Sequence, residues 1–392
     1  MKLIGTSIFV LMLSISISAE QSRQGESQDQ AATLGRGWTA LGAQQPARAL
    51  ELAQQLLRTD PSNHNALALA IAAFTASRQP LQGLDLYEKW LTASRHEDVF
   101  LLQPIARGVL RELAESREPR VRLLALAALA QTGDAEARQQ LQDAAADQSA
   151  PTEIDATLAA TGDEGAIRRL EAQITAGGPR DKSAAIDALA RANAQGSRQA
   201  LIAALKDPAP PSRMAAANAL ADLDATDAIP ALKAALQDPD PAARNMIAVA
   251  LARLGDSSGG VTLESLESSP LGDLRLIAAS AAARQNPQGP WADKVRGLLN
   301  DPDPLLRLRA ARLLLDHNRE TEAAASTLFS SLNDETPAVR TEAARVLRGL
   351  SQQRPDAQDP ASLRRLLRDR VPEVRIEAAA AILGTASGAP TK

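Results

Sequence analysis

The chain has 392 residues, of which 45% are hydrophobic and 2% aromatic, with no cysteine and a net charge of −4. The absence of cysteine excludes disulfides, thiolate metal sites and a lipid-modified N-terminal cysteine. A mildly acidic chain is also a poor candidate for binding nucleic acid, which requires a clearly basic surface. The apolar residues are mainly alanine and leucine, which favour helices over strands. The composition therefore predicts an all-α protein.

The N-terminus is typical of an export signal. Lys2 supplies a positive charge, residues 3–17 are apolar with interspersed serines, and Ala19 is a small residue at the expected cleavage position. The apolar run is short for a membrane span, so we expect residues 1–19 to be a cleaved signal peptide, with an uncleaved anchor as the alternative. Residues 20–30 lack apolar periodicity and are expected to be a flexible spacer. These features predict a periplasmic or secreted protein with no membrane span after signal removal.

Residues 31–95 show a helical pattern with corners marked by proline or asparagine. Small, aromatic and corner residues recur at spaced positions: Gly37, Ala40, Ala49, Asp60, Pro61, Phe74, Gly83, Tyr87 and Trp90. This placement resembles two degenerate tetratricopeptide repeats. Gly83 stands where that family prefers alanine, and the corner at Gln44 and Gln45 lacks the usual glycine. The resemblance implies two helical hairpins, and a plain pair of hairpins that caps an array is the alternative.

A bridging helix is expected within residues 96–116, and after it an aspartate recurs with an arginine six residues later. The pairs are Asp207 and Arg213, Asp238 and Arg244, Asp301 and Arg307, Asp334 and Arg340, and Asp369 and Arg375. These arginines are 31, 63, 33 and 35 residues apart, and Arg275 divides the longest interval into 31 and 32. A feature that returns every thirty-odd residues indicates a stacked array of one repeated unit.

Many copies of this unit agree in having Asp-Pro at one corner, Val-Arg or Leu-Arg soon afterwards, paired alanines, or Leu-Gly-Asp or Thr-Gly-Asp at the inner turn. Residues 117–386 thereby resemble HEAT repeats of the short type first named from phycobilisome lyases. The resemblance implies a right-handed α-solenoid of about eight or nine units. Pro151 replaces the arginine of the second unit, which we expect to be distorted. Residues 387–392 are expected to be a disordered tail.

The corner motif has a physical basis. Proline suits the first turn of a helix, where its missing N–H would be unpaired anyway, and a preceding aspartate can cap exposed amides. In the HEAT family the arginine reaches toward the aspartate of an adjacent repeat. The resemblance therefore implies a structural ladder of Asp207, Arg213, Asp238, Arg244, Arg275, Asp301, Arg307, Asp334, Arg340, Asp369 and Arg375. A binding site for phosphate or carboxylate on the arginines is the alternative.

Few residues could carry chemistry. Ser257 and Ser258 lie in a Gly-Asp-Ser-Ser-Gly-Gly stretch that nearly matches the nucleophile motif of trypsin-like proteases, but it has one serine too many and lies in a helical repeat. His96 and Glu97 are similar to the His-Glu pairs with which deoxyhypusine hydroxylase binds two irons, yet that family needs several such pairs. We predict no catalytic, metal-binding or cofactor-binding residues.

The second helices of the repeats are expected to line a concave binding face. Long cationic and aromatic side chains recur there, and the candidate partner-binding residues are Lys233, Arg296, Phe329, Arg364, Arg365 and Arg368. Their local positive charge would favour an acidic segment of another protein; an ordinary solvated helix face is the alternative. Trp291 and Phe329 are candidate anchors or core plugs. We expect a non-catalytic scaffold of the bacterial envelope; the alternatives are a HEAT-containing lyase or hydroxylase and a structural spacer.

Overall fold

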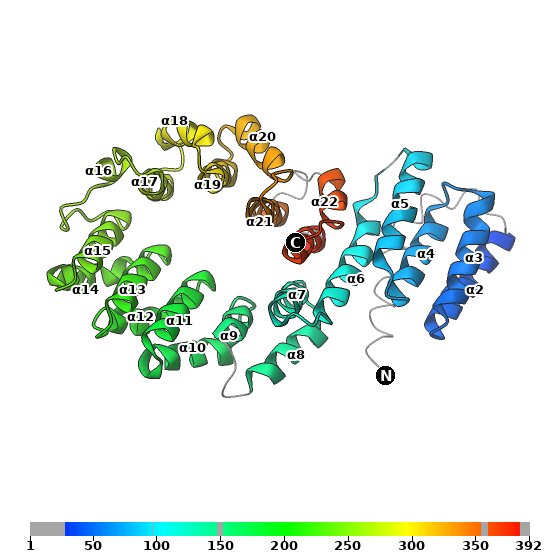
Figure 1. Cartoon of the computed structure of the whole chain (residues 1–392), viewed down its shortest axis with the longest axis horizontal. Helices are drawn as coiled ribbons and strands as arrows, with labels where there is room; N and C mark the ends of the chain where they lie inside the picture. The colour runs from blue at the N-terminus through cyan, green and yellow to red at the C-terminus, as the bar shows by residue number, and fades with distance from the viewer. Residues whose placement is uncertain (1–27, 96, 147–151, 354–359, 385–392) are drawn as a thin grey trace. The chain divides into compact units, whose positions relative to one another are not determined.

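The computed structural model describes residues 28–95, 97–146, 152–353 and 360–384, which form helices and turns with no strand among them (Figure 1). The predicted signal peptide, His96, Pro151 and the predicted tail lie outside the described residues. Helix α2 (Gln28–Gly42) begins within the range expected to be a spacer. Asp29 lies in its first turn, where a carboxylate is stabilised by the positive end of the helix dipole.

The helices divide into two compact units, one from residues 1–122 and 351–392 and the other from residues 123–350. The first unit thus contains both the early and the late parts of the chain. Its helices are α2, α3 (Pro46–Thr59), α4 (His64–Ala76), α5 (Pro80–Ser94), the 3-10 turn η1 (Val99–Leu101), α6 (Leu102–Ala114), α22 (Pro360–Leu366) and α23 (Pro372–Gly384). Helices α7 (Pro119–Gln131) and α21 (Pro337–Gln353) cross the division.

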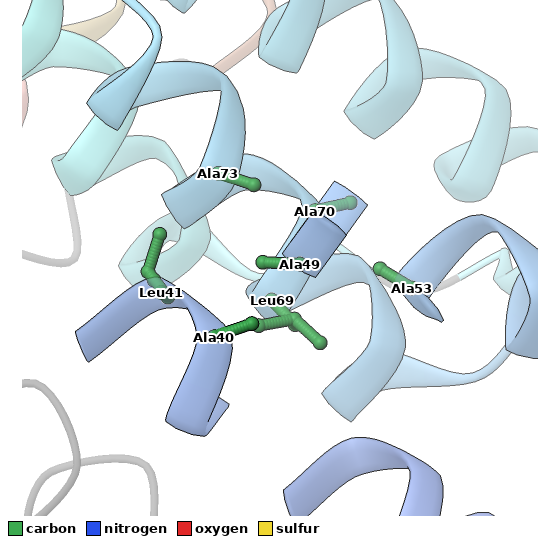
Figure 2. Packing of buried hydrophobic residues seen from close by; sticks show 7 residues of the cluster. All are labelled: Ala40, Leu41, Ala49, Ala53, Leu69, Ala70 and Ala73. Atoms are coloured by element: carbon green, nitrogen blue, oxygen red, sulfur yellow. The ribbon is translucent and has the colours of Figure 1, made fainter. Parts of the chain in front are cut away.

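Helices α2 to α5 form two hairpins through short corners. Proline begins α3 and α5, and the side chain of Asn63 caps α4 by accepting a hydrogen bond from the Ala66 N–H. The small core of α2, α3 and α4 is built mainly from alanine (Figure 2): Ala40, Leu41, Ala49, Ala53, Leu69, Ala70 and Ala73. Because alanine projects little beyond the backbone, these helices pack closely.

The second unit consists of helix pairs in which sequence neighbours pack against each other. Besides parts of α7 and α21 it contains α8 (Ala135–Ala145), α9 (Thr152–Ala159), α10 (Glu164–Ala176), α11 (Pro179–Arg191), α12 (Arg198–Ala204), α13 (Pro210–Asp222), α14 (Ile229–Ala234), α15 (Pro241–Arg253), α16 (Leu263–Glu267), α17 (Gly272–Gln285), α18 (Trp291–Arg296), α19 (Pro304–Asp316) and α20 (Thr321–Ser331). Short 3-10 turns η2 (Gln195–Ser197), η3 (Thr226–Ala228), η4 (Ala235–Gln237) and η5 (Gly297–Asn300) adjoin the even-numbered helices.

The odd-numbered members of this series are the first helices of the repeats, and α11, α13 and α15 pack along one another in that order. Proline begins α13, α15 and α19, and Asp240 and Asp303 cap the latter two. The paired alanines are buried at the helix contacts: Ala216, Ala217, Ala310, Ala311, Ala343 and Ala344. This alternation of helices with small residues at their contacts makes the chain an all-α solenoid, as the sequence predicted.

Candidate functional site

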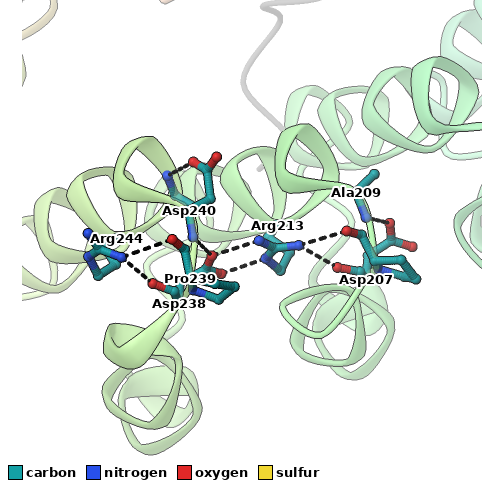
Figure 3. Close-up of polar contacts among 9 residues, drawn as sticks. Asp207, Ala209, Arg213, Asp238, Pro239, Asp240 and Arg244 are labelled. Atoms are coloured by element: carbon teal, nitrogen blue, oxygen red, sulfur yellow. Dashed lines mark hydrogen bonds and ion pairs between the residues drawn. The ribbon is translucent and has the colours of Figure 1, made fainter.

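Arg213 joins the corners of two successive repeats (Figure 3). Its Nη1 donates to the carbonyl oxygens of Asp207 and Pro208 at 2.8 and 3.0 Å. Its Nε and Nη2 donate to the two carboxylate oxygens of Asp238, at 2.5 and 2.6 Å. Such a bidentate, charge-assisted pair is the strong form of an ion pair. One guanidinium therefore connects the corner before α13 to the corner before α15.

The carbonyl half of this arrangement recurs along the array. At each corner Nη1 donates to the backbone oxygens six and five residues earlier, in Arg244, Arg275, Arg307 and Arg340. The carboxylate half varies: Lys182 Nζ lies 2.6 Å from Asp207, whereas Arg275 lies 3.9 Å from Asp301. In the repeat that follows Arg244, the corner aspartate is replaced by Ser269. The arginines thus hold these five corners, and Arg213 and Arg275 also face a carboxylate of the next repeat.

The corner aspartates also shape their own turns. The carboxylates of Asp207, Asp238, Asp301, Asp334 and Asp369 each accept a hydrogen bond from the backbone N–H two residues later. The hydrogen bond from Arg213 lowers the pKa of Asp238, and the same bond raises the pKa of Arg213. Both groups therefore remain charged at neutral pH. Because protein oxygens already accept from Nε and both terminal nitrogens of Arg213, this position is structural rather than an anion-binding site.

On the second helices, the predicted binding cations Lys233 and Arg296 are exposed but not isolated. Lys233 Nζ lies 2.6 Å from Asp256. Arg296 Nη2 lies 2.8 Å from Asp293 and also pairs with Glu320. Their side chains keep 45% and 51% of their surface exposed. Each cation is tethered on one side and open to solvent on the other, so a further acidic group can approach it.

These pairs belong to a second series of contacts, which sequence reasoning missed. A side chain of one second helix reaches the inner turn of the following repeat: Gln142 to Asp163 at 2.8 Å, Lys233 to Asp256, and Arg296 to Glu320. The bond from Gln142 lowers the pKa of Asp163. Bonds from Lys233 and then Ser258 lower the pKa of Asp256 to about 2. The Gly-Asp pairs that recur at the inner turns of the sequence could have indicated this second series of contacts.

The other three candidate cations lie in the first unit, on or directly after α22, and two of them contact residues of α5 and the turn that follows it. Arg364 forms an ion pair with Glu97 and lies over the Tyr87 ring at 5.8 Å. Arg368 Nη2 lies 2.7 Å from Asp85 and 2.9 Å from Glu88. Arg365 donates to the Ser362 hydroxyl at 3.3 Å. Lys233, Arg296 and Phe329 are instead in the second unit, so each group is a separate candidate surface.

The two candidate aromatic anchors differ. Trp291 is 1% exposed, donates its indole N–H to the Pro287 carbonyl at 3.2 Å and contacts His317 edge-on. Trp291 is therefore a core residue and not a surface anchor. Phe329 of α20 is half-buried, so part of its side chain can still contact a partner. Phe100 and Leu271 are large apolar side chains with high exposure that the sequence reading did not single out.

The residues considered for chemistry occupy structural positions. Ser258 donates its hydroxyl to Asp256 within the turn after α15. Another histidine, His64, also has protein partners: its Nε2 lies 2.6 Å from Asp98 Oδ2, and its ring contacts Trp90 edge-on. Glu97, beside His96, pairs with Arg364. Among the residues that the structure describes, no group of three or more His, Asp or Glu side chains could hold a metal ion. Within the same residues, no helix has the length and apolarity needed to cross a membrane.

The helix-pair architecture, the corner motif and the buried alanines define an α-solenoid of short helical repeats. The sequence model of the family described as HEAT repeats matches residues 167–252, 198–283 and 292–383, which together cover more than half of the chain. The chain therefore belongs to the HEAT-repeat family. The matches do not extend to residues 31–95, and the tetratricopeptide resemblance there stays a prediction.

Several solved structures are similar to this chain. Human deoxyhypusine hydroxylase in complex with glycerol is 21% identical with a TM-score of 0.34, over 66% of this chain and 98% of that one. An engineered protein is 20% identical with a TM-score of 0.27, over 88% and 96%. Kap121p is 15% identical with a TM-score of 0.30, over 93% and 46%. No curated protein matches this chain.

Proposed function

We propose that this protein is a non-catalytic scaffold that binds another protein through the second-helix face of its HEAT array, and that it acts in the bacterial envelope or periplasm. HEAT repeats form protein-interaction solenoids, whose stacked helices present an extended surface. The observation that carries the proposal is the recurrence of exposed cations, Lys233 on α14 and Arg296 on α18, on second helices of the second unit. The apolar start of the sequence after Lys2 supports export.

An acidic segment is the partner that this face fits best. Each cation already lies beside one carboxylate, which holds the long side chain in place while about half of its surface stays in contact with water. A second carboxylate from a partner can join without the loss of the first. Long-range attraction between such charges increases the rate of association and depends on ionic strength. The half-buried ring of Phe329 offers an apolar contact on the same kind of helix.

The decisive experiment compares two double charge reversals. Lys233→Glu with Arg296→Glu places repulsive charge on the proposed face. Arg180→Glu with Arg312→Glu makes the same change in charge on the first helices α11 and α19, where both side chains are also exposed. Partners are captured with each variant from native envelopes and identified by mass spectrometry. The first variant is expected to lose the partner that the second retains, with helicity unchanged in both; equal retention would contradict the proposal.

Two further measurements separate the scaffold from its alternatives. A HEAT-containing lyase or hydroxylase would carry a chromophore or metal, so metal analysis and an ultraviolet-visible spectrum of the purified protein distinguish it from a scaffold. A purely structural spacer would retain no partner in the capture experiment. Intact-mass measurement and fractionation of cells test the proposed location.

A further inference from the structure

The last described repeat of the chain packs against helices from its beginning. Helix α23 lies along α6 within the first unit (Figure 1). Nearly all of α23 is buried, from Val374 to Leu383. A terminal repeat of a solenoid usually needs a cap that covers its apolar face. Here the cover is supplied by a helix that precedes the HEAT array in sequence.

Ion pairs also join α22 and the residues directly after it to α5 and to the turn before α6. Arg368 meets Asp85 and Glu88, which lie three residues apart on α5, and Arg364 meets Glu97 in the turn before α6. Asp85 and Glu88 keep 56% and 42% of their side-chain surface exposed, and Arg368 keeps 35%. Pairs with this exposure contribute only about 0–1 kcal/mol each, because water and salt screen them.

Arg375 is held less closely by its carboxylate than Arg213 is. It occupies the same ladder position as Arg213, but its acid is Glu112 of α6, with Nη2 to Oε1 at 3.5 Å. Arg213 holds Asp238 with two hydrogen bonds at 2.5 and 2.6 Å. Nε and Nη2 of Arg375 are buried and make no hydrogen bond within the described structure. Glu112 thus stands in for the aspartate of a following repeat and satisfies the arginine poorly, which makes the contact costly.

We propose that the contact of α22 and α23 with α5 and α6 is a clasp that opens and closes, and that the closed clasp covers the apolar face of the terminal HEAT repeat. Three properties carry the inference. The apolar burial of α23 keeps the clasp closed at rest. The ion pairs of Arg368 are exposed, so salt or a change of charge weakens them, and buried nitrogens of Arg375 make no hydrogen bond within the described structure. Opening separates α23 from α6 and exposes the apolar face of α23 together with Arg364 and Arg368.

The chain contains no cysteine, so engineered pairs can be spin-labelled without background. The reporting pair is Gln54→Cys on α3 with Ala361→Cys on α22; the control pair is Gln54→Cys with Gln82→Cys, both within the N-terminal hairpins. All three sites are exposed. Double electron–electron resonance then gives the distance distribution of each pair. We expect one narrow distribution for the reporting pair at low ionic strength, and additional longer distances at about 1 M salt, where the Debye length is about 3 Å.

Arg368→Glu should raise the ratio of open to closed molecules by roughly tenfold or more, since it replaces two attractions by repulsions. The exchanged variant Asp85→Arg, Glu88→Arg, Arg368→Glu should restore the short distance, while the control pair stays constant throughout. If Arg368→Glu alters the distance of the control pair, the milder variant Asp85→Asn with Glu88→Gln replaces it as the test. That variant is expected to shift the reporting pair toward longer distances by a smaller amount. An unchanged reporting distance in the deciding variant, or failure of the exchanged variant to restore it, would overturn the clasp.

Discussion

Lys233 Nζ of α14 lies 2.6 Å from Asp256 Oδ2 in the turn that follows α15. The pair joins the second helix of one repeat to the inner turn of the next. The same carboxylate also accepts hydrogen bonds from the hydroxyl and the backbone N–H of Ser258. Asp256 therefore organises its own turn and holds the neighbouring repeat through one side chain, while Lys233 remains part of the exposed face.

This pair predicts a loss of stability in acid. The pKa of Asp256 is lowered from 3.8 to about 2 in the folded chain, chiefly by Lys233. A lowered folded pKa means that the stabilisation is complete above the unfolded pKa and disappears as pH falls through the folded one. The thermal midpoint of the wild type should exceed that of Asp256→Asn at pH 5, and the difference should vanish near pH 2. Lys233→Met should narrow the pH range over which this stabilisation is lost. A difference in thermal midpoint between wild type and Asp256→Asn that does not vary with pH would contradict the role given to this ion pair.

The ladder predicts unequal effects of equivalent substitutions. Arg213→Leu leaves Asp238, itself 8% exposed, without its counter-charge, and the loss of one partner of a buried pair costs about 3–5 kcal/mol. Arg307→Leu removes hydrogen bonds to the carbonyls of Asp301 and Pro302 and should cost about 1–2 kcal/mol. Hydrogen exchange of α13 and α15, compared with α19, measures both. Equal losses would show that the carboxylate adds nothing to the backbone contacts.

Two glycines of α2 should respond in opposite directions to alanine. A Cβ on Gly37 would lie 2.2 Å from Leu69 Cδ2 in the buried core, whereas a Cβ on Gly35 meets nothing within 4 Å. Gly37→Ala should therefore destabilise the N-terminal hairpins by about 1–3 kcal/mol through overpacking. Gly35→Ala should stabilise them by about 0.5–1 kcal/mol, because alanine has less freedom to lose on folding. Exchange rates of the amides in α3 and α4 give both values.

The start of the sequence predicts processing. If residues 1–19 are a signal peptide, the mature protein begins at or near Glu20 and is recovered from the soluble fraction. Intact-mass measurement of protein from its native cells determines the first residue. Ala19→Arg places a large charged residue at the cleavage position and should leave the precursor intact. Recovery of the full-length chain from membranes would favour the uncleaved anchor.

The repeat period explains why so much of the fold was predictable. A contact between successive repeats, such as Arg213 with Asp238, joins two positions of the corner motif, and the motif and its period of 31 residues mark both of them. The start of α15 at Pro241 follows from the same motif, because proline and its preceding aspartate suit a helix N-terminus. The all-α class and the HEAT family were confirmed on this basis.

The surroundings of the candidate cations were not predictable in the same way. Arg364 and Lys233 hold equivalent positions on second helices, yet Arg364 meets Glu97 and Lys233 meets Asp256. Glu97 lies outside the repeats, so no period connects it with Arg364. A contact between distant segments depends on the packing of α23 against α6, which no local pattern encodes. Trp291 was ambiguous for a related reason, because only the packing around an aromatic ring separates a core residue from an anchor.

The hydrogen bonds from the ladder arginines to corner carbonyls have a consequence for how such a chain can grow. A carbonyl oxygen belongs to every amino acid, so the bond survives when Ser269 or Glu335 occupies the corner in place of aspartate or proline. Each of the five units that begin with Arg213, Arg244, Arg275, Arg307 or Arg340 at this position thus holds the turn before its first helix with its own arginine. A duplicated unit inserted between two others would bring its own arginine with it. The array could therefore change in length by whole units without a new side-chain pair having to arise.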